Sequence, residues 1–266
     1  MFNPSFYWSP YVKIFAFRAI VRGQRYLSSF FSIEDHSGRT TTLLSPEHFG
    51  NPIVPRFIDP KVTRIGTDFF ITFNSGWIES GNDVFIMQIY PVVGLPKRLQ
   101  YGNRMTQERN WAFFHERGEV YALYWINPLK ILRLKAIKSD HWEMEDHYHS
   151  ESIDAKIPAD LTVGTPLAPS REGYCFIAHQ KRLVRNRKLY LGRFCALDFE
   201  SGTIRAGKHW LVHSLASILG SRVKHNTNLF SCTYFSGIQA SQDELTLGYG
   251  INDIDYGFAT LSPNEL

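Results

Sequence analysis

The feature that most constrains the fold of this chain is a loose internal repeat. In five places, a short alternating segment meets a turn and is followed by a second, more apolar segment. Successive turns are separated by steps of about 57, 52, 55 and 70 residues and lie near Ser9-Pro10, Gly66, Gly118, Gly173 and Asp243. Steps of this size are typical of propeller blades, each of which is a small antiparallel sheet. The sequence therefore predicts an all-β fold, a single five-bladed β-propeller domain over residues 1–266.

The loops between the blades of a propeller gather around one axis, so this fold predicts an axial funnel pocket as the place where function lies. The last repeat, from Tyr234 to Leu261, is short, and we expect the N-terminal segment to complete it. Residues 40–60 are rich in proline and are expected to form a connection between blades. Residues 207–220 carry the one moderately helical pattern.

The composition is that of a globular protein, with 44% hydrophobic and 20% charged residues among 266. The aromatic content, 15%, is high. Strands favour aromatic side chains, which explains most of them. A sugar site, where flat rings stack on pyranose faces, would explain the others. Sustained helical periodicity, a GxGxxG motif and a Walker motif are all absent, so nucleotide-binding α/β folds are excluded.

The net charge of +4 is modest, and the basic residues cluster in one run, Lys181–Lys188. Such a run is most often the solvated tip of a hairpin, although it could also hold a phosphate, a nucleotide or an acidic polymer. It lacks the interleaved aromatic residues of a nucleic-acid-binding platform, so we expect no nucleic-acid partner.

Three cysteines, Cys175, Cys195 and Cys232, have no metal-binding spacing and are expected to be buried free thiols. Their odd number favours a reducing compartment. We find no signal peptide and no apolar run of about 18 residues, so the expected protein is soluble and cytoplasmic, with no transmembrane segment.

The stretch from His141 to Asp154 is rich in His, Glu and Asp. It could hold a metal, but an outer strand with alternate side chains in water explains it better. We therefore expect neither a metal nor a cofactor.

Candidate functional residues are polar side chains placed where the inner strands of a propeller would begin or end. They are Asn3, Ser5, Arg18, Asp59, Glu108, Arg109, Asn110, His179, Asn252 and Asp253. Two carboxylates across a cleft could catalyse glycosyl transfer, one as acid and one as base or sugar clamp. Each residue also has a structural explanation, such as a turn for Asp59-Pro60 or an exposed ion pair for Glu108 and Arg109. Their recurrence at matching places in the repeats favours the functional interpretation.

Several short motifs resemble, in order, those of glycoside hydrolase family 130 and glycosyltransferase family 108, five-bladed propellers that act on β-mannosides. The motifs are Asn3-Pro4-Ser5, Phe15-Ala16-Phe17-Arg18, Ile58-Asp59-Pro60-Lys61-Val62, residues 108–114, Gly164-Thr165-Pro166, residues 173–179, Tyr190-Leu191-Gly192, Ala196-Leu197-Asp198 and residues 248–253. The resemblance covers nearly the whole chain. It implies a carbohydrate-active enzyme with a pocket for a sugar, a sugar phosphate or a nucleotide sugar.

The chain also departs from this family. Where the phosphorylases carry a proton-donating Asp, the candidates are Glu108 and Asn110, and we favour Glu108 because an amide has no titratable proton. Tyr124-Trp125 stand near the family's phosphate-binding Arg, which argues against phosphorolysis. Lys61 replaces another Arg, and the two are not equivalent at a bidentate site.

The function that these observations favour is inverting, metal-independent glycosyl transfer in polysaccharide or glycoconjugate metabolism. In this hypothesis Asp59 and Asp253 hold sugar hydroxyls, Glu108 handles the proton, and His179 and Arg109 meet an anionic donor. One alternative is a β-mannoside hydrolase or phosphorylase that uses the same pocket. Another is a propeller without catalysis, used for carbohydrate binding or protein assembly. The oligomeric state is left open.

Overall fold

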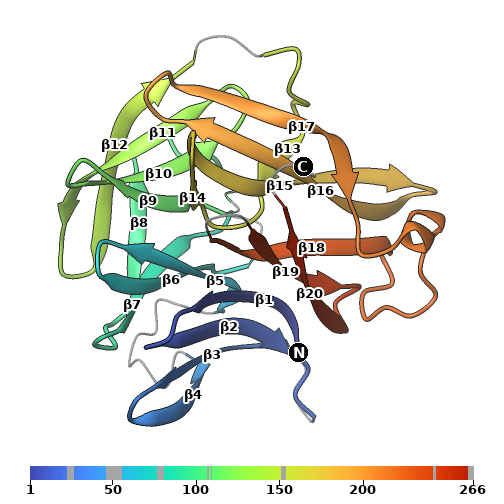
Figure 1. The fold of residues 1–266 in the computed structure, drawn as a ribbon, viewed down its shortest axis with the longest axis horizontal. Helices are drawn as coiled ribbons and strands as arrows, with labels where there is room; N and C mark the ends of the chain where they lie inside the picture. Colours follow the sequence, from blue (N-terminus) through green and yellow to red (C-terminus); the bar gives the residue numbers. More distant parts are fainter. Residues whose placement is uncertain are drawn as a thin grey trace.

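The computed structural model describes residues 1–22, 27–45, 56–76, 81–106, 108, 110–150, 154–241 and 244–262. Within them the chain is all-β, with one short 3-10 helix (Figure 1). The strands form five antiparallel groups that follow one another along the chain. They are β1 (Phe2–Trp8), β2 (Lys13–Ala19), β3 (Ser28–Asp35) and β4 (Gly38–Leu44); β5 (Ile58–Ile65), β6 (Asp68–Asn74), β7 (Val84–Tyr90) and β8 (Lys97–Tyr101); β9 (Ala112–Glu116), β10 (Glu119–Trp125), β11 (Lys130–Ile137) and β12 (His141–His149); β13 (Leu161–Val163), β14 (Ala168–Ser170), β15 (Gly173–Val184), β16 (Arg187–Asp198) and β17 (Thr203–Leu211); and β18 (Leu229–Ala240), β19 (Leu245–Ile251) and β20 (Asp255–Leu261).

The five turns predicted from the repeat each lie in a hairpin near the start of a group. Glu116 pairs with Glu119 across the third turn, where Arg117 and Gly118 both have positive φ. That conformation matches the twist of the flanking strands, and glycine adopts it without strain. Asp243 itself lies outside the described residues, but Ala240 and Leu245 pair on either side of the fifth turn.

Two expectations about local structure held only in part. Residues 40–44 belong to strand β4 and residues 58–60 to β5, so the expected connection is shorter than 40–60. Residues 207–211 complete β17, and in the described part of this stretch helical structure is limited to the single 3-10 turn η1 (Leu215–Leu219). A short run without a sustained apolar face does not stabilise an α-helix.

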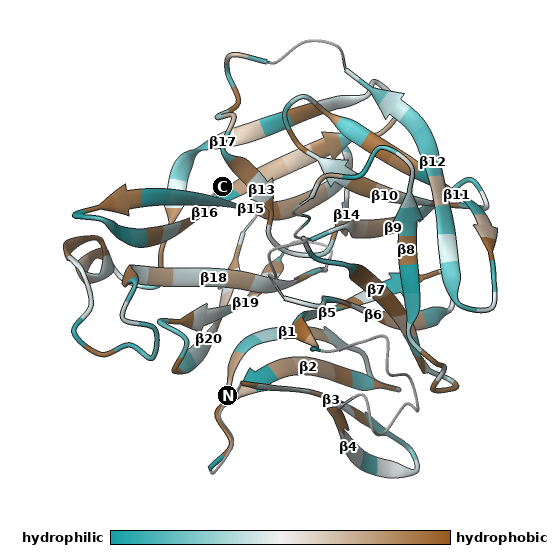
Figure 2. Cartoon of the chain, turned by 180° about the vertical axis from the view of Figure 1, so that it is seen from behind, coloured by the Kyte–Doolittle hydropathy of each residue, from teal (hydrophilic) through white to brown (hydrophobic). Residues whose placement is uncertain are grey.

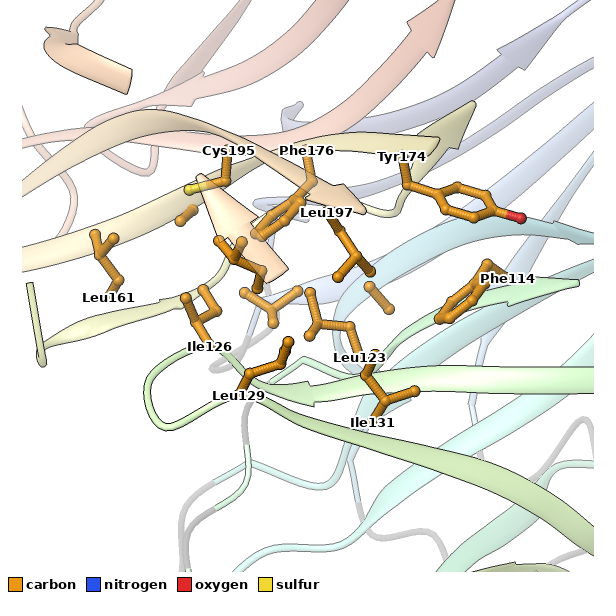
Figure 3. Close-up of a cluster of buried hydrophobic side chains, with 14 of the residues drawn as sticks. Phe114, Leu123, Ile126, Leu129, Ile131, Leu161, Tyr174, Phe176, Cys195 and Leu197 are labelled. Carbon is orange, nitrogen blue, oxygen red and sulfur yellow. The ribbon is translucent and has the colours of Figure 1, made fainter. Parts of the chain in front are cut away.

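Consecutive groups pack against each other through apolar faces. Figure 3 shows the cluster between the third and fourth groups, where Phe114, Leu123 and Ile131 meet Phe176 and Leu197. Similar clusters join the first group to the second, the second to the third and the fourth to the fifth. Each large side chain that is fully buried contributes about 1.5–3 kcal/mol, so these faces supply most of the driving force for folding.

The last group packs on the first. In β1, the backbone N–H and C=O of Trp8 bond to the Gln239 side chain of β18, both at 2.7 Å. Phe6 and the Pro4 carbonyl lie so close to Gly237 and Gly248 that a Cβ at either glycine would collide with them. The expectation that the N-terminal segment completes the last group was wrong, because β1 hydrogen-bonds to β2 as part of the first group.

Two parallel pairings join the outer parts of different groups. Strand β12 pairs with β8, with His141 opposite Arg98, and β16 pairs with β18, with Lys188 opposite Leu229. The part of the chain that the structure describes contains no helix with the length and hydrophobicity needed to cross a membrane.

Candidate functional site

The candidate site begins with a backbone feature that occurs in both of the first two groups. Asn3 and Asp59 each have φ of 52° and each precede a proline. Both lie where the register of the first hairpin shifts, between Phe2 and Ser5 in one group and between Ile58 and Lys61 in the other. Asn and Asp tolerate this left-handed conformation, and proline needs no ladder partner for its nitrogen. The two irregularities are therefore equivalent bulges that redirect a polar side chain.

Arg18 and Asp59 form the charged centre of the site. Arg18 Nη1, on β2, donates to Asp59 Oδ1 at 3.1 Å, and the Tyr234 hydroxyl donates to Asp59 Oδ2 at 3.3 Å. The side chains of Arg18 and Asp59 are 13% and 21% exposed. The pair is thus well enclosed but still reachable, which suits charge-assisted hydrogen bonds to a polar ligand.

Asp253 adds a second carboxylate to this centre. It follows Asn252 in the turn between β19 and β20, and both have positive φ. Asn252 Oδ1 accepts from the backbone N–H of Cys232 at 2.8 Å, which holds the turn against β18. Burial raises the pKa of Asp253, and the negative charge of Asp59 raises it further, while Arg18 opposes both effects. Asp59 and Asp253 therefore influence each other and Arg18 electrostatically.

A cavity of about 310 Å³ is connected to this centre through the Tyr234 hydroxyl, although Arg18, Asp59 and Asp253 are not among the residues that line it. Its wall includes Asn110, Tyr124, Trp125, His179, Lys181 and Tyr190. Asn110 Nδ2 donates to Val163 O at 2.9 Å and lies 3.4 Å from the Tyr234 hydroxyl. The rings of His179 and Tyr234 are 4.3 Å apart. A chain of hydrogen bonds therefore runs from Arg18 through Asp59 and Tyr234 to the cavity wall.

Lys61 lies behind the same tyrosine. It is buried, its ammonium bonds to the Gly164 carbonyl, and its Nζ lies 5.1 Å from the centre of the Tyr234 ring. Burial lowers the pKa of Lys61 to about 8, although the charge of Asp59 opposes that shift. A Cβ at position 164 would collide with the Ile177 carbonyl oxygen and press against the His179 ring, so glycine allows this close approach.

Glu108 occupies a different environment from Asp59. Its side chain is 1% exposed and pairs with Arg104 Nη2 at 3.0 Å. The Tyr124 hydroxyl donates to Glu108 Oε1 at 2.7 Å. Burial raises the pKa of Glu108, against the effects of Tyr124 and Arg104. Like Arg18, Asp59 and Asp253, Glu108 is not among the residues that line the cavity; it contacts the lining residue Tyr124, whereas Asn110 lines the cavity directly.

The other predicted residues have mixed placements. Ser5 Oγ accepts from Val62 N at 2.8 Å, a buried contact that ties β1 to β5. Asn3 is buried against Gly250, where any Cβ would collide with it. Arg109 lies outside the described residues. The structure therefore brings together Arg18, Asp59 and Asp253 at the centre, and Asn110 and His179 on the cavity wall.

Sequence reasoning missed several residues of this site. Tyr234 and Tyr190 were not selected as site residues, and Lys181 entered only within the basic run 181–188. Lys61, Tyr124 and Trp125 entered only as departures from a family pattern. The tyrosines could have been found from the sequence, because they lie within apolar strand segments and a buried tyrosine hydroxyl usually has a hydrogen-bond partner.

The acidic stretch on β12 forms a ladder of ion pairs, as an outer strand should. Lys135 pairs with Glu143 at 2.6 Å and Arg133 with Glu145 at 2.5 Å on the neighbouring strand β11. Among the described residues, no group of three or more His, Cys, Asp or Glu side chains is arranged to hold a metal ion. All three cysteines are buried free thiols, as expected.

The fold is one that carbohydrate-active enzymes of known structure share. No family model and no curated protein matches the chain. A glycosyl hydrolase from Bacteroides ovatus has a TM-score of 0.66 at 11% identity, covering 99% of this chain and 84% of that one. A β-1,2-mannobiose phosphorylase from Listeria innocua also has a TM-score of 0.66, at 15% identity, covering 99% and 90%. A GDP-Man-dependent mannosyltransferase from Leishmania mexicana has a TM-score of 0.60 at 12% identity, covering 98% and 85%. At these identities the likeness establishes the shared fold.

Proposed function

We propose that this chain is a glycosyl-transferring enzyme built on one five-bladed β-propeller domain. The observation that carries the proposal is the hydrogen-bond chain from Arg18 through Asp59 and Tyr234 to Asn110 on the cavity wall. Five antiparallel groups, each packed on the next and the last packed on the first, support a ring of five blades. The fold shared with hydrolases, a phosphorylase and a mannosyltransferase supports the chemistry.

In this proposal the charged centre holds the sugar. The carboxylates of Asp59 and Asp253 accept hydrogen bonds from its hydroxyls, and Arg18 keeps Asp59 in place. Such charge-assisted bonds are about twice as strong as neutral ones.

The transfer step uses the same carboxylate pair. The acceptor hydroxyl attacks the anomeric carbon as the bond from that carbon to the donor's phosphate oxygen breaks, and the released proton passes to Asp59 or Asp253. The raised pKa of Asp253 suits it to take up that proton. Lys181 and His179, on the cavity wall, face the departing phosphate. Glu108, by holding Tyr124, shapes the wall.

A second candidate function is sugar binding without catalysis. It is favoured by the position of Asn110, which lines the cavity although an amide cannot exchange a proton, while Glu108 is enclosed. The two candidates share the sugar pocket and differ only in turnover.

The deciding experiment incubates the purified protein with GDP-mannose or mannose-1-phosphate, with and without a β-mannoside acceptor, and with β-mannobiose with and without phosphate. Products are followed by mass spectrometry and binding by thermal shift, because a ligand of the native state raises the melting temperature. We expect a product one hexose longer than the acceptor. Free mannose would indicate a hydrolase and mannose-1-phosphate a phosphorylase. Binding without any product would favour the second candidate.

The matched variants are Asp59→Asn and Asp68→Asn, which change the same type of residue on strands β5 and β6 of one hairpin. Only Asp59→Asn should abolish both binding and product. If both variants keep full activity, the proposed site is wrong.

A further inference from the structure

Charge is strongly segregated along this chain. Residues 173–242 contain ten Lys and Arg but only two acidic residues, Asp198 and Glu200, whereas the whole chain has 29 and 25. Both acidic residues lie at the turn between β16 and β17. The chain between Glu200 and Asp243 contains no Asp or Glu at all. Few carboxylates are therefore close in sequence to these basic residues, although Arg205 pairs with Glu172 just outside the region.

Two segments of this region project at the same end of the molecule. One is the tip of the β15–β16 hairpin, which turns at Arg185 and Asn186. The other is the loop of residues 212–228, which contains η1. The two are joined where Lys188 N donates to Asn228 O at 2.8 Å and β16 pairs with β18. Figure 1 shows both at the right edge, and Figure 2 shows both at the left edge from behind.

The same end exposes large aliphatic side chains. Leu215 and Leu219 of the 212–228 loop are 83% and 85% exposed, Val223 is 68% exposed, and Leu183 of the hairpin is 68% exposed. A single exposed leucine is ordinary, but several on neighbouring segments mark an interaction surface. We call Leu183, Arg185, Arg187, Leu215, Leu219 and Val223 the basic–apolar face.

We propose that the basic–apolar face docks this protein on an anionic lipid bilayer. Exposed aliphatic side chains enter the boundary between headgroups and acyl chains, and the surrounding cations meet lipid phosphates and carboxylates. Each Lys or Arg near such a surface contributes about 1 kcal/mol. The near absence of acidic residues in this region removes the repulsion that would oppose docking.

Other partners fit this face less well. Single-stranded nucleic acid is bound through free aromatic platforms, but the Trp210 ring already contacts the guanidinium group of Arg193, at 3.8 Å from the ring centre, and that of Arg182, at 5.1 Å. A second copy of the chain would place one cluster of cations against another, which costs free energy. A lipid surface complements both the charge and the apolar side chains.

Docking would also place the cavity near the bilayer. Lys181 lines the cavity and belongs to β15, whose far end forms the hairpin tip. The inference about the surface does not depend on the proposed glycosyl transfer, and its test does not use activity.

The test is co-sedimentation of the whole protein with vesicles of phosphatidylcholine alone and of phosphatidylcholine with about a third phosphatidylserine. Three double variants accompany the wild type: Arg185→Glu with Arg187→Glu, Leu215→Ser with Leu219→Ser, and the control Val92→Ser with Leu95→Ser. The control residues are 67% and 62% exposed in the β7–β8 connection, so they match the leucines in exposure.

We expect wild type and control to sediment with the anionic vesicles and not with the neutral ones. Each of the other two variants should lower the apparent affinity at least about tenfold. All substituted side chains are exposed, so the melting temperature should stay unchanged in every variant. Equal binding to both kinds of vesicle, or unchanged binding in the variants, would overturn the proposal. So would absence of vesicle binding together with self-association that the leucine variant removes, which would make this face a contact between copies.

Discussion

Asp59 and Glu108 have the same kinds of partners in different surroundings. Each carboxylate pairs with an arginine, at 3.1 Å for Asp59 and Arg18 and at 3.0 Å for Glu108 and Arg104. Each also accepts a hydrogen bond from a tyrosine hydroxyl, that of Tyr234 or Tyr124. The side chain of Asp59 is 21% exposed, whereas that of Glu108 is 1% exposed.

This difference separates a binding role from a structural one. A ligand can replace or add to the contacts of Asp59, because part of its side chain is open to solvent. Glu108 has its contacts inside the protein, and its backbone is held as well, since its N–H donates to Asn82 Oδ1 at 2.8 Å. Local partners alone would not have distinguished the two carboxylates.

The largest expected effect is on ligand binding by Asp59→Asn. The amide keeps the shape but loses the charge that binds sugar hydroxyls and Arg18. We expect affinity for the sugar ligand to fall about a hundredfold, or roughly 3 kcal/mol, measured by calorimetry. A loss of less than about threefold would remove Asp59 from the binding site and end the comparison with Glu108.

The second effect is on stability, through Glu108→Gln. The carboxylate accepts from Tyr124 at one oxygen and pairs with Arg104 at the other, whereas the amide has only one acceptor oxygen, so one of these enclosed contacts is lost even though Arg104 keeps its ion pair with Asp83 at 2.7 Å. This loss should exceed the gain from removing a carboxyl whose pKa burial raises, and should lower the free energy of unfolding by about 2 kcal/mol in urea denaturation. Ligand affinity should stay within about threefold of wild type, because the Glu108 side chain is 1% exposed and offers a ligand almost no contact. A large loss of turnover in a variant of normal stability and affinity would restore Glu108 to the catalytic role expected from the sequence.

Asp253→Asn should raise the stability of the protein, whereas Glu108→Gln should lower it. Because the folded pKa of Asp253 is raised above its ordinary value of 3.8, the native state loses stability as pH rises through that interval. The amide has no such cost, so the variant should melt at a higher temperature than wild type at neutral pH. Asn is compatible with the positive φ at this position. The matched control, Asp255→Asn at an exposed position of the same hairpin, should leave the melting temperature unchanged.

The smallest effect concerns Lys61. Its pKa is about 8 in the folded protein and 10.5 ordinarily, so between these values the unfolded chain binds more protons and stability rises with pH. Tyrosines and cysteines titrate in the same range, so the informative quantity is the difference from Lys61→Met. The stability of wild type relative to this variant should increase from pH 8 to 10.5. A difference that stays constant with pH would show that burial does not destabilise the charged form of Lys61.

Features set by local chemistry could be predicted from the sequence. Glycine marked three of the five predicted hairpin turns, Gly66, Gly118 and Gly173, and alternation marked the strands on either side. Asp59-Pro60 and Asn3-Pro4 share a pattern that corresponds to equivalent bulges.

Contacts between distant residues could not be predicted in this way. Tyr234 meets Asp59 and Asn110 from the opposite end of the chain, and no local pattern links them. The sequence could not decide between Glu108 and Asn110 for a related reason. Both precede β9, where no regular alternation determines which side chain faces the cavity. The parallel pairs β8–β12 and β16–β18 depend on how the groups pack, which composition and period do not determine.

The contact between β1 and β18 has a consequence for synthesis on the ribosome. The chain emerges from its N-terminus, yet Trp8 finds its hydrogen-bond partner Gln239 only after 231 further residues have been made. Until then the apolar side chains of β1, among them Phe2 and Phe6, lack the surface that covers them in the finished fold. Contacts between residues so far apart in sequence form slowly, and strands that are still exposed are prone to aggregate before these contacts form. The nascent protein should therefore depend on chaperones early in translation and become independent of them only once its last hairpin has been released.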